Sequence, residues 1–116
     1  MSIELLHSAD FDVAVVLPAE LRRVVSQGIN NIAPWHIMDR DLAKKRMGGM
    51  RARYRTRYVP FARRQDNDDL ACLDPGVPGQ VVIVHDFASD GSERATTYGT
   101  FWDWFRAAVE EMIAFE

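Results

Sequence analysis

The stretch VPFARRQDNDDLACLD, residues 59–74, decides how this chain folds. Two short runs with apolar β-branched or aromatic side chains stand on either side of a polar segment rich in turn-forming residues. A connection this short cannot hold a parallel crossover, so the two runs are expected to pair as antiparallel strands. The charged residues between them could form a catalytic or metal-binding loop, or only a charged turn.

The segments on both sides extend the same pattern. The runs VVIVHD and ERATTY follow, each after a turn-rich segment, which predicts an antiparallel meander. TFWDWFRAAVEEMIAF then carries apolar residues at helical spacing, and Thr100 with Asp103 resembles a capping box. Another helix is expected from about 18 to 28, between Pro18 and Gly28. The expected fold is α+β, a sheet flanked by an N-terminal helix and a long C-terminal helix.

Residues 29–57 give weaker signals. Residues 29–38, INNIAPWHIM, are expected to form a loop that leads to a short strand, because Pro34 forces an extended residue before it. Beyond them, Gly48 and Gly49 interrupt any helix begun at Asp41, and MRARYRTRYV alternates as a strand does. We therefore expect a short helical turn and then an extended edge strand with its arginines on one face.

Length and composition indicate one globular domain. The chain has 116 residues, 47% of them hydrophobic and 27% charged, and no linker divides it, so residues 1–116 are expected to form a single domain. No apolar run approaches the roughly 20 residues that cross a bilayer. The N-terminus lacks the features of a secretory signal, and the single Cys72 cannot form an internal disulfide. We expect a cytoplasmic protein without a membrane partner.

Charge is segregated along the chain, although the net charge is only -3. Residues 39–64 hold ten basic side chains against two acidic ones, and residues 65–116 hold eleven acidic side chains against two arginines. The basic segment 44–64, with tyrosines among its arginines, resembles a nucleic-acid-binding patch. A pI near 5.6 argues against that function, since such domains are basic. The arginines are also placed to pair with carboxylates across the sheet.

The acid cluster of residues 66–69 suggests a metal site, because Ca²⁺ and Mg²⁺ need several oxygen ligands at one point. Its spacing fails the calcium-loop pattern, since Leu70 stands at the fifth ligand position and Ala71 where the sharp turn needs glycine. His85 precedes Asp86, but neighbouring strand residues point to opposite faces, so these side chains should not meet. We expect a charged turn, with no catalytic residue, no metal ion and no cofactor.

The order of these parts resembles the SUKH superfamily, which includes yeast cell-wall-synthesis regulators of the Smi/Knr type and many bacterial proteins. The resemblance covers about residues 17–113 and is carried by LPAEL, Pro34-Trp35, VPFARRQDNDDLACLD, VVIVHDF and TFWDWFRAAV. It implies an α+β fold and binding rather than catalysis. The loop after Pro60-Phe61-Ala62 usually contains glycines in that family, whereas QDNDD has none. The family positions that carry over, mostly fold-defining, are Trp35, Pro60, Phe61, Asp66, Asp68, Asp69, Asp74, His85, Phe101 and Trp104.

Many bacterial members of this superfamily are immunity proteins that neutralise toxins, often nucleases. The leading hypothesis is therefore a non-enzymatic protein-binding module, an immunity protein whose acidic half covers the basic groove of a cognate toxin domain. Two other hypotheses are a metal-dependent hydrolase that uses residues 66–69 and His85, and a nucleic-acid-binding domain that uses residues 44–64. The sequence identifies neither the toxin nor the oligomeric state. The candidate contact residues, on loops at the rim of the sheet, are Asp66, Asp68, Asp69, Asp90 and Glu93.

Overall fold

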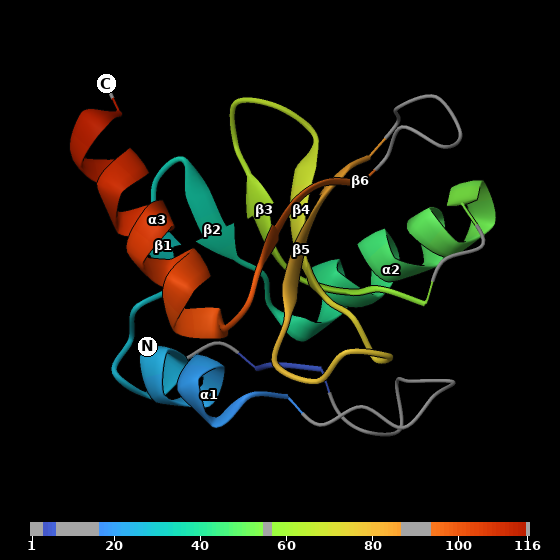
Figure 1. The fold of residues 1–116 in the computed structure, drawn as a ribbon, viewed down its shortest axis with the longest axis horizontal. Helices are drawn as coiled ribbons and strands as arrows, with labels where there is room; N and C mark the ends of the chain where they lie inside the picture. Colours follow the sequence, from blue (N-terminus) through green and yellow to red (C-terminus); the bar gives the residue numbers. More distant parts are fainter. Residues whose placement is uncertain (1–3, 7–16, 55–56, 87–93, 116) are drawn as a thin grey trace.

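The computed structural model describes residues 4–6, 17–54, 57–86 and 94–115 (Figure 1). The strands form one antiparallel sheet in the order β1-β2-β3-β4-β5-β6, so the expected α+β fold and meander are confirmed. None of the described helices is long and apolar enough to cross a membrane. In chain order the elements are α1 (Ala19–Ser26), β1 (Asn31–Ile32), β2 (Trp35–Ile37), α2 (Arg40–Tyr54), β3 (Val59–Arg64), β4 (Asp69–Leu73), β5 (Val81–His85), β6 (Arg94–Tyr98) and α3 (Phe101–Ala114).

The strands β3, β4 and β5 form the centre of the sheet. β3 pairs with β4 in the register Arg63↔Leu70, and β4 pairs with β5 in the register Asp69↔His85. Residues 70–73 and 81–84 are all buried, because elements cover both faces of these strands. A strand buried on both faces has no polar side to its pattern, which is why the run VVIV is continuously apolar.

The two terminal helices lie close to their expected positions. α1 follows Pro18 and buries Leu21, Val24 and Val25. The chain then leaves α1 through Gly28, whose φ of 76° is a conformation that glycine adopts without steric cost. At the start of α3, the hydroxyl of Thr100 accepts a hydrogen bond of 3.1 Å from the backbone N–H of Asp103. That bond is the N-cap contact that the sequence predicts at this position.

An aromatic cluster fixes α3 on one face of the sheet. It consists of Trp35 on β2, Phe61 on β3, and Phe101 and Trp104 on α3, all of them buried. The ring centroid of Trp104 lies 5.7 Å from that of Trp35 and 4.9 Å from that of Phe61, both in edge-to-face contacts. Such pairs add to the energy of apolar burial, so they hold the long helix across several strands.

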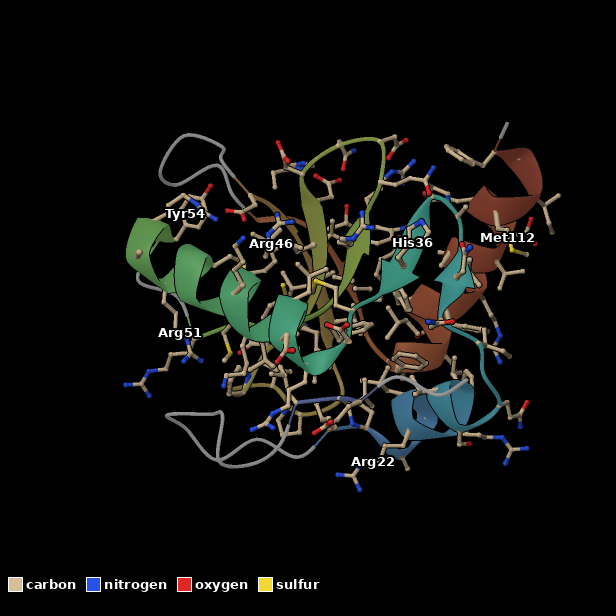
Figure 2. The ribbon with its side chains drawn as sticks, turned by 180° about the vertical axis from the view of Figure 1, so that it is seen from behind. Arg22, His36, Arg46, Arg51, Tyr54 and Met112 are labelled. Atoms are coloured by element: carbon tan, nitrogen blue, oxygen red, sulfur yellow. The ribbon has the colours of Figure 1, made fainter. Side chains whose placement is uncertain are left out.

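α2 covers the opposite face, as the two views in Figures 1 and 2 show together. The expected helical turn followed by an edge strand is wrong, because Arg40–Tyr54 form one helix that runs through Gly48 and Gly49. Ala43, Met47 and Met50 are buried on its inner side, at the spacing of one helical face. Each glycine costs a helix about 1 kcal/mol, whereas burying a methionine side chain contributes about 1.5–3 kcal/mol. Tertiary packing therefore outweighs the two glycines.

Candidate functional site

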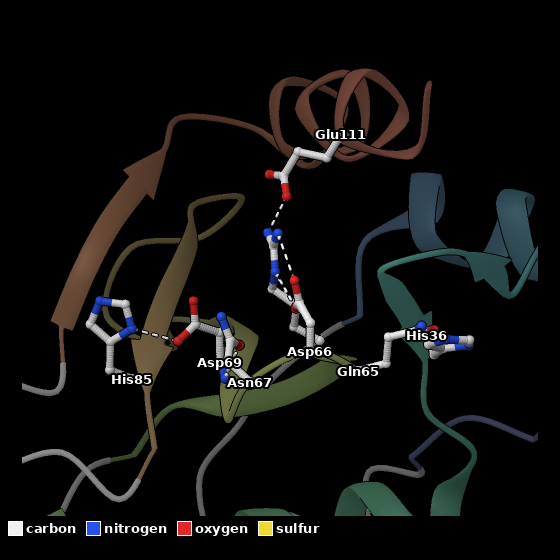
Figure 3. A network of polar contacts seen from close by, with 8 residues as sticks. His36, Gln65, Asp66, Asn67, Asp69, His85 and Glu111 are labelled. Atoms are coloured by element: carbon white, nitrogen blue, oxygen red, sulfur yellow. Dashed lines mark hydrogen bonds and ion pairs between the residues drawn. The ribbon is translucent and has the colours of Figure 1, made fainter. Parts of the chain in front are cut away.

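Charged side chains from three strands, one turn and α3 gather at the exposed end of the sheet (Figure 3). This cluster is called the polar end. The candidate contact residues Asp66, Asp68 and Asp69 belong to it, whereas Asp90 and Glu93 lie outside the described residues. The polar end consists of Arg64, Asp66, Asp68, Asp69, His85 and Glu111.

The turn between β3 and β4 is built by its own polar side chains. The side-chain oxygen of Asn67 accepts a hydrogen bond of 2.8 Å from the backbone N–H of Asp69. The backbone carbonyl of Asp68 accepts one of 3.3 Å from the N–H of Asp86 in the neighbouring connection. Asn and Asp stabilise turns in this way, so the expected charged turn between two strands is confirmed.

Arg64 links this turn to α3. Its guanidinium donates to both carboxylate oxygens of Asp66, at 2.6 and 3.3 Å, and also bonds the carboxylate of Glu111. The same group lies 5.8 Å from the ring centroid of Trp35, in cation–π range. The hydrogen bond from Arg64 holds the pKa of the Asp66 carboxyl below its ordinary value of 3.8. Asp66 is therefore an anion fixed in one direction at neutral pH.

His85 and Asp69 form a second pair within the polar end. They are directly opposite each other on β5 and β4, and the Nδ1 of His85 lies 2.5 Å from a carboxylate oxygen of Asp69. The side chain of His85 is 49% exposed, whereas that of Asp69 is 16% exposed. A carboxylate bound to Nδ1 orients the imidazole and leaves Nε2 as its other polar atom. This arrangement can hold the ring for binding, and it is also the orientation that a general base needs.

Asp68 differs from the other two acids of the turn. Its side chain is exposed, and among the described residues none bonds or pairs with its carboxylate. Among the described residues, Asp66 is the acid of this turn that pairs with an arginine, Arg64. Asp68 is thus an exposed anion of the polar end that stands in the chain between Asp66 and Asp69, whose directions are fixed.

The sequence reasoning missed a buried ionic cluster on the opposite face of the sheet. The side chain of Asp86 is fully buried, and its carboxylate bonds Arg46 at 3.1 Å and Arg53 at 2.8 and 2.5 Å. His85 and Asp86 do not meet, as strand alternation predicts. Arg46 and Arg53 are seven residues apart, two helical turns, and this spacing in a segment with one apolar helical face is the signal that could have revealed the cluster.

The remaining family-type positions are structural. Pro60 and the aromatic residues Trp35, Phe61, Phe101 and Trp104 are buried in the sheet or its aromatic cluster. Asp74 closes the turn after β4, where its carboxylate accepts a hydrogen bond of 2.9 Å from the N–H of Gly76. These residues position the polar end without taking part in it.

Two further hypotheses have less geometric support. In the described part of the basic segment 44–64, Arg51 and Arg53 lie on a helix rather than in a row on a strand. Arg46, Arg53 and Arg64 are engaged with carboxylates. In the described part of the chain, no three His, Cys, Asp or Glu side chains are grouped so that they could hold a metal ion. Nucleic-acid binding by residues 44–64 stays an untested prediction.

Comparison of this chain with protein-family models, curated proteins and solved structures yields no match.

Proposed function

We propose that this protein is a non-enzymatic protein-binding module that docks a basic surface of its partner on the polar end. The observation that carries the proposal is the gathering of the carboxylates of Asp66, Asp69 and Glu111 on one exposed end of the sheet (Figure 3), with Asp68 exposed in the same turn. Only Arg64 and His85 oppose them within the cluster. The finer proposal, an immunity protein that neutralises a bacterial toxin, rests on the resemblance of the sequence to the SUKH superfamily.

The geometry suits rapid capture of a basic partner. Arg64 and His85 hold the carboxylates of Asp66 and Asp69 in fixed directions, so less side-chain entropy is lost when a partner binds. Asp68 stands exposed between them. Complementary charge mainly raises the rate of association and excludes acidic partners, and it acts over roughly 8 Å at physiological salt. The polar end would therefore steer a basic protein before apolar contacts form.

The test begins with the gene neighbourhood: if a large upstream open reading frame ends in a C-terminal toxin domain, that domain serves as the partner. Co-expression should rescue cells if that domain is toxic, and surface plasmon resonance should show binding that weakens with salt. The triple variant Asp66→Lys, Asp68→Lys, Asp69→Lys should lower the association rate constant by at least about tenfold. Binding with an unchanged association rate would refute the polar end as the docking surface.

A matched control keeps this result specific. Asp41→Lys makes the same kind of charge reversal on α2, which begins at the end of the sheet away from the β3–β4 turn (Figure 1). Asp41 is exposed, so this variant should keep the fold and the wild-type association rate. An equal slowing by Asp41→Lys would show that net charge, rather than the polar end, governs binding.

The His85–Asp69 pair favours a second candidate, a metal-dependent hydrolase. An imidazole held by a carboxylate is a common unit of metal sites and of general-base catalysis. Calorimetric titration with Mn²⁺ and Mg²⁺ tests this candidate, which requires saturable binding heat in the wild type and its loss in His85→Gln. A titration without binding heat would remove the candidate and leave the binding module.

A further inference from the structure

A groove of about 440 Å³ opens beside α2, over the short strands β1 and β2. His36 lies in it, and Figure 2 shows this residue on β2, on the side of the sheet that carries Arg46. This is the face opposite the aromatic cluster, so the groove is separate from the polar end. The lining residues that matter are Asn30, Asn31, His36, Asp39, Leu42 and Arg63.

Arg63 is the unusual member of this lining. It is half-buried on β3, and among the described residues none forms an ion pair or a hydrogen bond with its guanidinium. Arg46, Arg53 and Arg64, by contrast, are bound to carboxylates of the fold. A partly buried guanidinium without an anion forfeits favourable interactions, because its five donors are held in a fixed planar fork. The fold therefore leaves this arginine available to a ligand.

The polar neighbours of Arg63 are held in place by contacts of their own. His36 is directly opposite Arg63 in the β2–β3 pairing, so the two side chains are adjacent on one face. Gln65 bonds the Nε2 of His36 and thereby fixes the ring. The backbone carbonyl of Asn30 accepts a hydrogen bond of 2.8 Å from the N–H of Ile37, which anchors Asn30 at the rim.

The one acidic residue in the lining is already engaged. A carboxylate oxygen of Asp39 accepts a hydrogen bond of 3.1 Å from the backbone N–H of Leu42, so it caps the start of α2. Leu42 itself is half-buried and gives the groove an apolar wall. The lining thus combines a free guanidinium, an imidazole, an amide and an apolar surface. That set fits a small ligand with one anionic group and a less polar body.

We propose that the groove binds a small ligand through an oxyanion, a carboxylate or a phosphate group, held by the guanidinium of Arg63 with His36 and Asn30 beside it. Arginine binds either group through two parallel hydrogen bonds, which gives both affinity and direction. The body of the ligand lies against Leu42. This site is independent of the polar end and of any protein partner.

The experiment is a titration of ¹⁵N-labelled protein with acetate, with inorganic phosphate and with chloride, at constant ionic strength. Saturable shifts of the amides of Asn30, Asn31, His36 and Arg63 are expected with acetate, phosphate or both, and not with chloride. The oxyanion that saturates at lower concentration identifies the ligand group. Shifts that are equal for all three salts, or that centre elsewhere, would overturn the proposal.

Three variants test the assignment of roles. Arg63→Gln should weaken oxyanion binding at least about tenfold, as expected when a charged hydrogen-bond donor is lost. Asn30→Asp adds a carboxylate to the rim with almost no change of shape, so it should weaken binding even if Arg63→Gln disturbs the sheet. Arg22→Gln removes an exposed arginine of α1 and should leave the affinity unchanged. Unchanged affinity in Asn30→Asp, or an equal loss in Arg22→Gln, would contradict the site.

Discussion

His85 and Asp86 are adjacent in the chain, yet the sheet gives them separate roles. His85 faces the polar end and pairs with Asp69, whereas Asp86 is buried against α2. Alternation along a strand predicts this divergence from the sequence alone. It does not predict the partners. The strand register places Asp69 opposite His85, and the position of α2 on the sheet brings Arg46 and Arg53 to Asp86. The sequence therefore predicts on which face of the sheet each of these side chains lies, but not which residue it contacts.

Asp86 should contribute more to stability than any acid of the polar end. Asp86→Asn keeps the shape of the side chain and removes the buried negative charge that Arg46 and Arg53 share. We expect the free energy of unfolding to fall by about 2–3 kcal/mol, at or just below the range for breaking a buried ion pair. The value lies low because the side chains of Arg46 and Arg53 are 21% and 31% exposed and can rehydrate. Urea denaturation measures the loss.

The control for this prediction is Asp68→Asn, which removes an exposed acid with the same change of chemistry. It should alter the free energy of unfolding by less than about 0.5 kcal/mol, as surface substitutions usually do. Similar losses in the two variants would mean that the buried cluster contributes no more than a surface charge.

The ion pair of Arg64 and Asp66 should affect how the stability of the protein depends on pH. The carboxyl of Asp66 has a lowered pKa in the folded protein, so its stabilising effect is complete above the ordinary value of 3.8 and is lost as the pH falls through the lowered value. In Arg64→Gln the pKa of Asp66 should return toward 3.8, since the hydrogen bond from Arg64 is the main cause of the shift. Carboxyl ¹³C shifts followed against pH measure both values. An unshifted pKa in the wild type would contradict this account.

At the scale of elements, strands β3 to β6 and the terminal helices follow from local pattern, whereas β1 and α2 do not. Turn-rich connections and apolar runs predict the meander, and an apolar stripe with an N-cap predicts α3. In α2, local sequence and tertiary packing disagree: Gly48 and Gly49 break the helical pattern, while Met47 and Met50 bury one face against the sheet. The packing decides the outcome, and a single sequence does not reveal which surface the helix will meet.

The two glycines of α2 should respond differently to alanine. A Cβ at Gly48 would have nothing within 4 Å, so Gly48→Ala should raise the free energy of unfolding by about 0.5–1 kcal/mol. A Cβ at Gly49 would lie 3.0 Å from the guanidinium of Arg53, which must then shift by a few tenths of an ångström while it is bonded to Asp86. Gly49→Ala should therefore gain less or lose stability. Urea denaturation of both variants checks this, and equal gains would show that Arg53 adjusts without cost.

At the scale of the molecule, folding mixes charges that the sequence keeps apart. Arginines of the basic block, residues 39–64, meet carboxylates of the acidic block at two places, with Asp86 on one face and with Asp66 and Glu111 on the other. Of the arginines in RARYRTRY that are expected to pair with carboxylates across the sheet, Arg53 does so, but from a helix rather than a strand. Arg46 and Arg64 pair with acids as well. What remains for a partner is a local surplus of acid at the polar end rather than an acidic half.

The two faces of the sheet should also unfold together. Strands β3 to β5 are buried on both faces, so the aromatic cluster under α3 and the packing under α2 share the same backbone. We expect one two-state transition in urea, as for most domains of this size. Far-UV circular dichroism, tryptophan fluorescence, which reports on Trp35, Trp102 and Trp104, and labelling of Cys72 should give the same midpoint.

Cys72 makes this test stringent, because its side chain is buried on β4 at the centre of the sheet. Burial raises the pKa of its thiol well above the ordinary value of 9.0, so the group is both inaccessible and protonated in the folded protein. Labelling by a disulfide reagent should occur only as the whole domain unfolds. Labelling at urea concentrations below the fluorescence transition would show instead that the α2 side opens alone, and that residues 1–116 do not behave as a single cooperative domain.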